Sequence, residues 1–303
     1  MKPRHSSTAT DSATPVHADV ASYGCVQAAP DQFPVLRQKP GPGIGQSLPN
    51  NFLKHADEQT VVALAAVLQA IEQFRMSETC FDGWGVAAAP FFLGRATLVQ
   101  ALQRYAAEGA WGLSPHFIPH RSQHAISGTI SQALKIHGPN FGAGGGPGAA
   151  AEALLAGAVL LEGSRLPGVW VVLTGWDPEY VPDPQGRPTC ETTCQAVALA
   201  LVGPRPGCSG TKLSVLPRSR SERQDEQPAK TCPTGPTLQA VQQALRASAA
   251  ETIPLLWELE GGGRIELASG GLNGCAPPTA FASRIAGRPR TLQQAGAGTE
   301  KKR

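Results

Sequence analysis

Apolar residues recur at intervals of three and four in three segments of the chain, which is the spacing of a helix that buries one face. The predicted helices are 57–74, 95–108 and 122–136. Asp57 stands just before the first apolar position of its segment and is predicted to cap that helix. In the second helix Leu98, Leu102 and Tyr105 share one face, and Gly109 follows the last periodic residue. We therefore expect three amphipathic helices in the first half of the chain.

Short apolar runs stand before, between and after these helices, and they are rich in β-branched or small residues, as buried strands are. The runs are 19–27, 84–90, 167–174 and 195–202. We expect 195–202 to be the antiparallel neighbour of 167–174 at the edge of the sheet. Strands that alternate with helices along a chain indicate a layered α/β architecture. The pattern thus predicts a mixed sheet with flanking helices.

The most unusual part of the pattern runs from Gly138 to Leu161. A short strand, Asn140–Gly144, leads into a turn made almost wholly of glycine, and residues 149–161 then hold a single charged residue, Glu152. A helix that is apolar almost all round is expected to be buried. A strand, a sharp glycine turn and a buried helix form the geometry that presents a nucleophile at a helix N-terminus. The nucleophile itself is missing from this turn.

The C-terminal part of the chain has a different composition. Residues 203–236 are rich in proline, glycine and charge and are predicted to form a linker, within which Leu213–Leu216 pairs briefly. A helix over 237–250 and a hairpin of 254–260 with 264–267 are predicted to form a small α/β extension. The full division is a disordered N-terminus, 1–18, a main domain, 19–202, the linker, the extension, 237–270, and a flexible basic tail, 271–303.

Composition and charge narrow the class of protein. Hydrophobic residues make up 41% of the 303 residues, which is enough for a sizeable core. The net charge of +3 comes from residues 281–303, which carry six Lys or Arg against one Glu, so no basic face for nucleic acid is predicted. The N-terminus lacks the apolar core of a signal peptide, and no apolar run approaches a membrane span. Seven cysteines without a regular framework fit a reducing compartment, so we expect a soluble, cytoplasmic protein.

Four short motifs between Asp57 and Val202 are distinctive. They are Gly138-Pro-Asn-Phe141, Ser114-Pro-His-Phe-Ile-Pro119, Ala125-Ile-Ser-Gly128 and Val171-Val-Leu-Thr-Gly-Trp-Asp-Pro-Glu179. Together they resemble the β-ketoacyl synthases, members of the thiolase-like superfamily. The resemblance implies an α/β fold that matches the N-terminal half of such an enzyme. This thiolase-like half-domain has a mixed five-stranded sheet, flanking helices and a central buried helix.

The resemblance also implies where a catalytic site would lie. In the family the glycine turn carries a nucleophilic cysteine, and counting forward from Phe141 places that position at Pro147. Proline cannot attack an acyl group, and it is a favourable first residue of a helix. The two downstream histidines of the family are absent, since no histidine follows His137. No catalytic residue is therefore predicted, and the candidates for the elbow and an acyl pocket are Gly144, Gly145, Gly146, Pro147, Phe117 and His120.

A nucleotide site is not expected in the same glycine turn. The dinucleotide fingerprint would need glycine at Pro147 and a carboxylate at the end of the next strand. Glu162 comes before that strand instead of after it. No Gly-Lys-Ser or Gly-Lys-Thr sequence supplies a phosphate-binding loop elsewhere.

Histidines and cysteines raise the question of a metal site. His116, His120 and His124 would stack on one helix as zinc ligands, but Pro115 and Pro119 interrupt such a helix. A second set of candidate zinc ligands has one close pair and irregular spacing: Cys190, Cys194, Cys208 and Cys232. Loop histidines and buried apolar cysteines are the commoner case. No metal or other cofactor is therefore expected.

The resulting expectation is a non-catalytic relative of the β-ketoacyl synthases in fatty-acid or polyketide-type metabolism. It would act as a structural or regulatory partner of a complete ketosynthase, or bind acyl chains or a carrier protein. The alternative is an active acyltransferase of the 3-oxoacyl synthase type whose nucleophile lies elsewhere, at Cys80 or Cys190.

A dimer is also implied, because in the family the strand before the elbow, here Asn140–Gly144, pairs antiparallel with its copy. We expect a homodimer or a heterodimer with a ketosynthase. An acyl-carrier protein is a further candidate partner, whereas nucleic acid and membrane are not expected.

Overall fold

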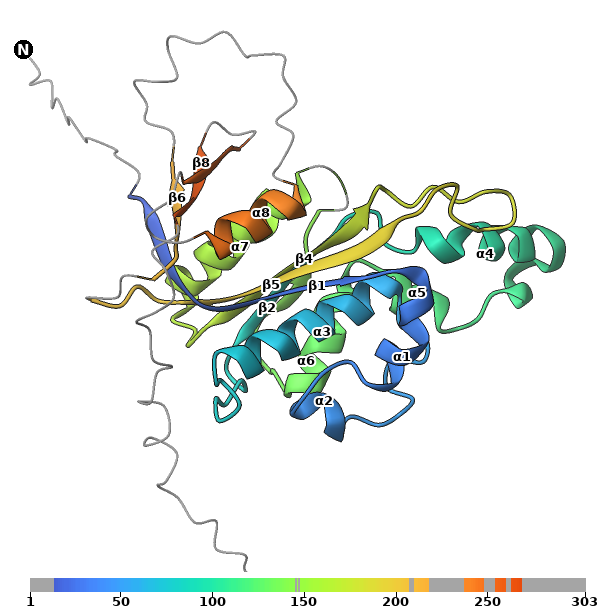
Figure 1. The fold of residues 1–303 in the computed structure, drawn as a ribbon, viewed down its shortest axis with the longest axis horizontal. Coiled ribbons are helices and arrows are strands. Elements are labelled where there is room, and N and C mark those ends of the chain that lie inside the picture. Colours follow the sequence, from blue (N-terminus) through green and yellow to red (C-terminus); the bar gives the residue numbers. More distant parts are fainter. Residues whose placement is uncertain are drawn as a thin grey trace, which may run out of the picture.

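A computed structural model describes residues 14–144, 146, 148–206, 210–217, 237–247, 254–259 and 263–268. The described residues form one twisted sheet with helices on both of its faces (Figure 1). Alternate residues of the strands point to the two faces, so each face has its own hydrophobic core. None of the helices in these ranges is both long and apolar enough to cross a bilayer.

The sheet has eight strands in the order β3-β2-β4-β5-β1-β6-β8-β7. The strands are β1 Val16–Ala28, β2 Gly85–Pro90, β3 Asn140–Gly142, β4 Val169–Asp177, β5 Thr193–Val202, β6 Lys212–Leu216, β7 Leu255–Glu258 and β8 Arg264–Ala268. β2 pairs in parallel with β3 and β4, and the other pairings are antiparallel. The mixed sheet predicted from the sequence is confirmed, and its first five strands carry the predicted half-domain.

Three details of the sheet differ from the sequence prediction. The strand expected at the edge, β5, does pair antiparallel with β4 but lies inside the sheet, because the long strand β1 occupies its other side. β1 begins at Val16, so residues 16–18 are a strand and the prediction that they are disordered is wrong. The C-terminal hairpin is not a separate layer, since β8 pairs with β6 and the hairpin extends the sheet.

Four helices cover one face of the sheet (Figure 1). They are α1 Phe33–Gln38, α2 Ile44–Ser47, α3 Glu58–Gln73 and α6 His124–Leu134, and the short turn η1 Pro30–Gln32 precedes α1. Asp57 caps α3 as predicted, because its carboxylate accepts a bond of 3.0 Å from the backbone N–H of Gln59. α3 lies so close to β1 that a β-carbon on Gly24 would stand 2.0 Å from the carbonyl oxygen of Ala66.

Two helices cover the opposite face, α7 Ala149–Ser164 and α8 Leu238–Arg246. Gln242 holds α8 to the sheet, since its side chain bonds to Gln27 of β1 and Gln195 of β5. α7 was expected to be buried, and this prediction holds for its inner side only. Its inner positions are buried against the strands, whereas Val159 on its outer side remains 50% exposed.

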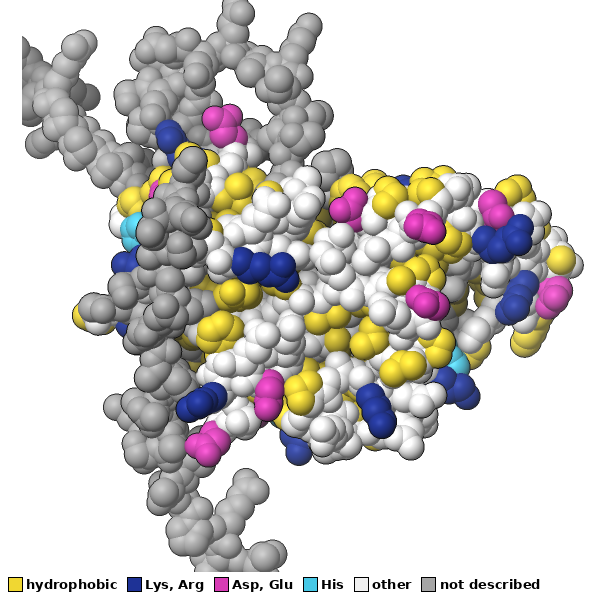
Figure 2. All heavy atoms as spheres, in the orientation of Figure 1, with side chains coloured by type: hydrophobic (Ala, Val, Ile, Leu, Met, Phe, Trp, Pro, Cys, Tyr) yellow, Lys and Arg dark blue, Asp and Glu magenta, His cyan; other side chains and the backbone are white. Residues whose placement is uncertain are grey.

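The chain between β2 and α6 leaves the body of the sheet as an excursion, residues 91–122. It contains α4 Arg95–Glu108, the turn η2 Gly109–Gly112 and α5 Phe117–Arg121. α4 and the glycine after it were predicted and are confirmed, yet no residue of α4 is buried. α4 extends away from the helices that cover the sheet, whereas α5 returns toward α1 and the start of α3 (Figure 1). Over the end of the molecule that holds α4, charged side chains of both signs stand beside hydrophobic ones (Figure 2).

Candidate functional site

The glycine elbow lies where β3 leaves the edge of the sheet and α7 begins. Gly144 has a φ of +72°, a conformation that side chains other than glycine rarely adopt. A β-carbon on Gly144 would lie 2.2 Å from that of Ala149, so the first turn of α7 packs directly on this glycine. Gly146 is placed as part of the same turn. Two of the predicted elbow residues, Gly145 and Pro147, lie outside the described residues.

The elbow is braced by the junction between α5 and α6. A β-carbon on Gly142 would stand 2.2 Å from the backbone oxygen of Gln123, which explains why the strand before the elbow has no side chain there. The side-chain amide of Gln123 also donates a hydrogen bond to the carbonyl oxygen of Gly144. The elbow is therefore in direct contact with the residue that joins the excursion to α6.

A carboxylate stands over the first turn of α7. The two carboxylate oxygens of Glu152 lie 3.3 and 3.7 Å from the positions that β-carbons would occupy on Gly144 and Gly148. The positive end of the helix dipole favours a negative charge at this place. An acyl-transfer enzyme needs the same place for the negative charge that develops on its substrate. Glu152 is exposed and makes no capping hydrogen bond to α7, so it adds a negative charge near the start of the helix without filling the place of an oxyanion.

The predicted pocket residues Phe117 and His120 both belong to α5 and lie in the excursion. The ring of His120 stands 6.0 Å from the rings of both His55 and His116, and His55 stacks on His116 at 4.4 Å. His124 is separate from this group, because it begins α6 and contacts the hydroxyl of Ser127.

The three-histidine stack predicted as one alternative does not form, because α5 ends at Arg121 and α6 starts a new helix. Within the described ranges, no group of His, Cys, Asp or Glu is placed to hold a metal ion. The sequence did not predict that His55 belongs to this group of histidines, because no motif surrounds it.

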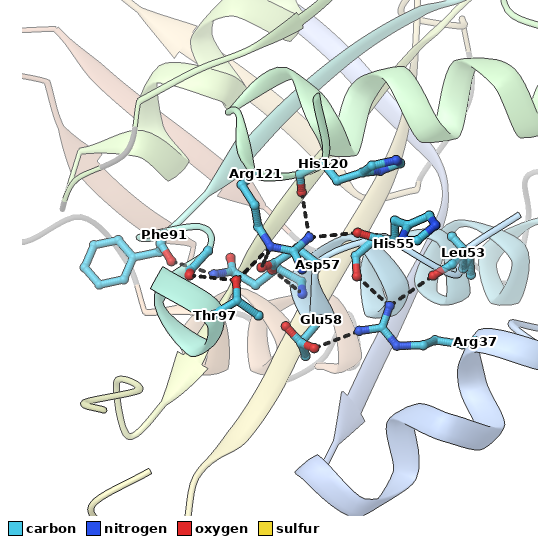
Figure 3. A network of polar contacts seen from close by, with 12 residues as sticks. Arg37, Leu53, His55, Asp57, Glu58, Phe91, Thr97, His120 and Arg121 are labelled. Carbon is cyan, nitrogen blue, oxygen red and sulfur yellow. Dashed lines mark hydrogen bonds and ion pairs between the residues drawn. The ribbon is translucent and has the colours of Figure 1, made fainter. Parts of the chain in front are cut away.

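Arg121 ties the excursion to the body of the molecule (Figure 3). Its guanidinium donates to the hydroxyl of Thr97 and to the backbone oxygens of His55 and His120, at 2.9, 2.9 and 3.0 Å. It also stands 3.6 Å from the carboxylate of Asp57, whose side chain is 2% exposed. Four short contacts from one side chain hold the start of α4, the end of α5 and the start of α3 together.

Burial dominates the chemistry of Asp57. The loss of water and the neighbouring charge of Glu58 raise the pKa of its carboxyl, Arg121 offsets only part of this effect, and the resulting pKa is about 7. Desolvation likewise lowers the pKa of His120, and the nearby His55 and Arg121 act in the same direction. Asp57 also has a structural role, because it serves as the cap of α3.

A cleft of about 490 Å³ opens next to this network. Its walls include Phe33, Trp176 and Tyr180, and the ion pair of Arg37 with Glu58, 2.7 Å apart, lies in its lining. The other donors of Arg37 are taken by the backbone oxygens of residues 53 and 56 (Figure 3). The cleft therefore presents aromatic surface and a charge pair that is already neutralised.

The described cysteines considered as a replacement for the missing nucleophile are either buried or outside the elbow. Cys194 is buried in β5, and burial raises the pKa of its thiol well above the usual range. Cys80 and Cys190 are exposed free thiols outside the elbow. Cys208 and Cys232, the other predicted zinc candidates, lie outside the described residues.

Comparison with known proteins shows which fold the chain shares. No family model matches the sequence, and no curated protein matches it. Solved structures do match, and they are ketosynthases and chain length factors. The ketosynthase ApeO in complex with its chain length factor ApeC from Xenorhabdus doucetiae aligns with a TM-score of 0.52 at 12% identity, over 84% of this chain and 99% of that chain.

Two further complexes are similar over less of their length. One is the type II acyl-carrier protein in complex with its ketosynthase AntDE, with a TM-score of 0.49 and 14% identity over 67% of this chain and 69% of that chain. The other is the ishigamide ketosynthase/chain length factor, with a TM-score of 0.47 and 14% identity over 65% of this chain and 66% of that chain. The likeness concerns the fold: the chain has the thiolase-like fold of ketosynthases and chain length factors, as the sequence predicted.

Proposed function

We propose that this protein is a non-catalytic member of the ketosynthase-like fold that serves as the structural partner of a complete ketosynthase in fatty-acid or polyketide-type synthesis. The observation that carries the proposal is the elbow. Glu152 places a negative charge at the start of α7, and the sequence offers Pro147 where the family has its cysteine. Two chemical arguments support the proposal: proline has no side chain that can attack an acyl group, and a negative charge near the helix start disfavours a developing oxyanion.

The partner role is supported by the size of the matched protein. Since 84% of this chain aligns with 99% of the chain from Xenorhabdus doucetiae, that chain is itself shorter than this one. Its structure is a complex of a ketosynthase with a chain length factor. A chain of this length and fold therefore has a precedent as one member of a two-chain assembly.

The free edge of β3 supports the same role. Among the described strands β3 pairs with β2 alone, so its other side offers unpaired backbone groups to a second strand. Its sequence, Asn140-Phe-Gly, brings little side-chain bulk to that edge. We expect the partner to complete the sheet here, as a homodimer or, in the assembly that we favour, a heterodimer with a ketosynthase.

Intact-mass spectrometry tests the absence of catalysis. The purified protein is incubated with acyl-CoA or with an acylated carrier protein, and no covalent acyl adduct is expected. A complete ketosynthase treated in the same way provides the positive control. Stoichiometric acylation of any cysteine, Cys80 and Cys190 included, would contradict the proposal and favour an active acyltransferase.

Restoring the nucleophile provides a second test. Pro147→Cys alone is expected to yield no condensation product, because the negative charge of Glu152 and the lack of downstream histidines remain. The double variant Pro147→Cys with Glu152→Gln should gain at most acylation of the new cysteine. Condensation by the single variant, alone in solution, would show that the elbow is complete after all.

A further inference from the structure

A polar cleft opens beside the free edge of β3. Its volume is about 480 Å³, and its walls come from one flank of α6, from the turn that follows α6 and from Asn140 at the start of β3. The side-chain amide of Asn140 donates a hydrogen bond of 2.6 Å to the hydroxyl of Ser131 on α6. Asn140 therefore belongs both to the edge strand and to the wall of the cleft, and a strand that pairs with β3 runs beside this cleft.

The backbone of β3 leaves hydrogen-bonding groups on its open side. The carbonyl oxygen of Pro139 accepts from β2 at 2.8 Å, and the N–H of Ala143 donates to β2 at 2.7 Å. Successive residues of a strand direct these groups to opposite neighbours, so the N–H and C=O groups of Asn140 and Gly142 point away from β2. An added strand completes such an edge, because it bonds to the backbone and places its side chains in neighbouring pockets.

The cleft is rich in hydrogen-bond donors. His124, Gln132, Lys135 and His137 line it, and all four are exposed. The carboxylate of Asp82 is already engaged, since it lies 2.6 Å from Nδ1 of His137. Among the described residues, Lys135 has no ion-pair partner and no Asp or Glu lines the cleft. A carboxylate supplies the opposite charge and the acceptor oxygens that a free ammonium group binds best.

A second copy of this chain brings no carboxylate to the cleft. Two β3 strands that pair antiparallel about a two-fold axis place their α6 helices on the same face of the joined sheet. Neither α5 nor α6 contains an acidic residue, and the exposed Glu152 belongs to α7 on the opposite face.

The antiparallel arrangement also brings donors of the two copies together. His124 lies beside Gly142 at the end of β3, whereas Lys135 lies near its start. Antiparallel pairing sets the start of one strand against the end of the other, so Lys135 would face His124 of the second copy. Two donors that meet without a carboxylate between them disfavour a homodimer.

We infer that the edge of β3 and this cleft select a different chain, whose edge strand carries an aspartate or glutamate on the face of α6, and that they discriminate against a second copy. The inference rests on the proposed function, in which that chain is the ketosynthase, and adds how the edge distinguishes it from a copy of the chain itself. In strand addition the main-chain bonds give affinity and the side-chain pockets give specificity. Lys135 is the central contact, since it carries the permanent charge of the cleft.

Affinity measurements test this role of Lys135. The full chain is isolated from its own cells, and mass spectrometry is expected to identify a ketosynthase among the proteins that bind it. Lys135→Glu should weaken binding to this ketosynthase by about tenfold or more, because it sets two carboxylates against each other. Rising salt should weaken the wild-type complex more than that of Lys135→Gln. The matched control is Lys212→Glu, exposed on β6 with four strands between it and β3, which should alter binding less than about threefold.

Self-association of the isolated chain provides a readout of opposite sign. Lys135→Glu should strengthen it, because the new carboxylate would face His124 of the second copy. Sedimentation equilibrium measures this effect, and a variant that merely misfolds would lose both kinds of assembly. Hydrogen exchange measured by mass spectrometry tests the strand pairing directly. The backbone N–H groups of residues 140–142 should exchange more slowly in the complex with the ketosynthase than in the isolated chain.

The outcomes separate the inference from the proposed function. The inference is overturned, and the proposed function stands, if the ketosynthase binds Lys135→Glu as tightly as the wild type or if exchange at 140–142 stays fast in the complex. The same holds if the wild-type chain forms a dimer of two copies that protects 140–142. If no ketosynthase associates with the chain, the proposed function itself fails and the inference fails with it.

Discussion

The two longest helices, α3 and α7, have the same length of 16 residues and lie on opposite faces of the sheet. α7 is the more apolar in sequence, whereas α3 carries three glutamines and a threonine. Yet α3 is buried along nearly its whole length, and α7 keeps a partly exposed outer side. The difference arises from what covers each helix: α1, α2 and α6 pack against α3, and α7 packs chiefly on strands.

The apolar content of a helix indicates how much surface it is able to bury, and not how much its own chain buries. The outer side of α7 and the stripe of Leu98, Leu102 and Tyr105 on α4 are both apolar surfaces without a complete cover among the described residues. The sheet face next to α7 is partly covered by α8, whose Val241 and Leu245 join the same core. The C-terminal extension therefore covers part of the surface, and we expect a partner to cover the rest.

The largest effect is expected in α3. Leu64 is fully buried between the sheet and the helices that cover α3, so Leu64→Ala should lower the free energy of unfolding by about 3 kcal/mol. Urea denaturation followed by circular dichroism measures the change. Leu102→Ala on the exposed stripe of α4 is the matched control, for which the loss should stay below about 0.5 kcal/mol. Equal losses would show that the excursion is buried in solution.

A smaller, pH-dependent effect is expected at the cap of α3. The pKa of Asp57 is about 7 in the folded protein, above its usual value, so the folded state favours the protonated carboxyl. Its contribution to the free energy of unfolding is therefore present at low pH and is lost as the pH rises through 7. Asp57→Asn keeps the cap and removes the charge. The stability of this variant relative to wild type should therefore rise by about 2 kcal/mol between pH 5 and pH 9.

Denaturation midpoints at five or more pH values decide this prediction. The control is Asp31→Asn, at an exposed residue in the short turn before α1. The difference in the free energy of unfolding between this variant and wild type should be constant over the same pH range. A difference for Asp57→Asn that falls with rising pH would show that the ion pair with Arg121 outweighs the cost of burial.

Much of the fold could be predicted because local signals agreed with the final packing. The helix of α3 has its periodicity and its cap within one stretch of sequence, and β4 has an uninterrupted apolar run. The position of β5 inside the sheet was not predictable, because it depends on the pairing with β1, almost 180 residues earlier in the chain. Local patterns carry no information about such distant neighbours.

The candidate site was predictable only in part. The run of glycines makes the turn recognisable in the sequence. The close approach of Gln123 to Gly142 gives the physical reason for the glycine just before this turn. Glu152 is an exposed acid in the first turn of α7, which its position in the sequence already indicates. His55 and Arg121 belong to a network that joins segments more than 60 residues apart, so no local motif reveals it.

The smallest effect on the isolated chain is expected at Val159 of α7. Because this side chain is half exposed, Val159→Gln should change the free energy of unfolding by less than about 0.5 kcal/mol. The same substitution at Val67, fully buried on α3, is the matched control and should cost at least about 3 kcal/mol, because it leaves a polar amide in the core. Sedimentation equilibrium at micromolar concentration accompanies both measurements. If Val159→Gln is as damaging as the change at Val67, or converts a dimer to a monomer, the outer side of α7 is covered by a second copy. A small effect in a protein that sediments as a monomer leaves this side of α7 free for a different chain.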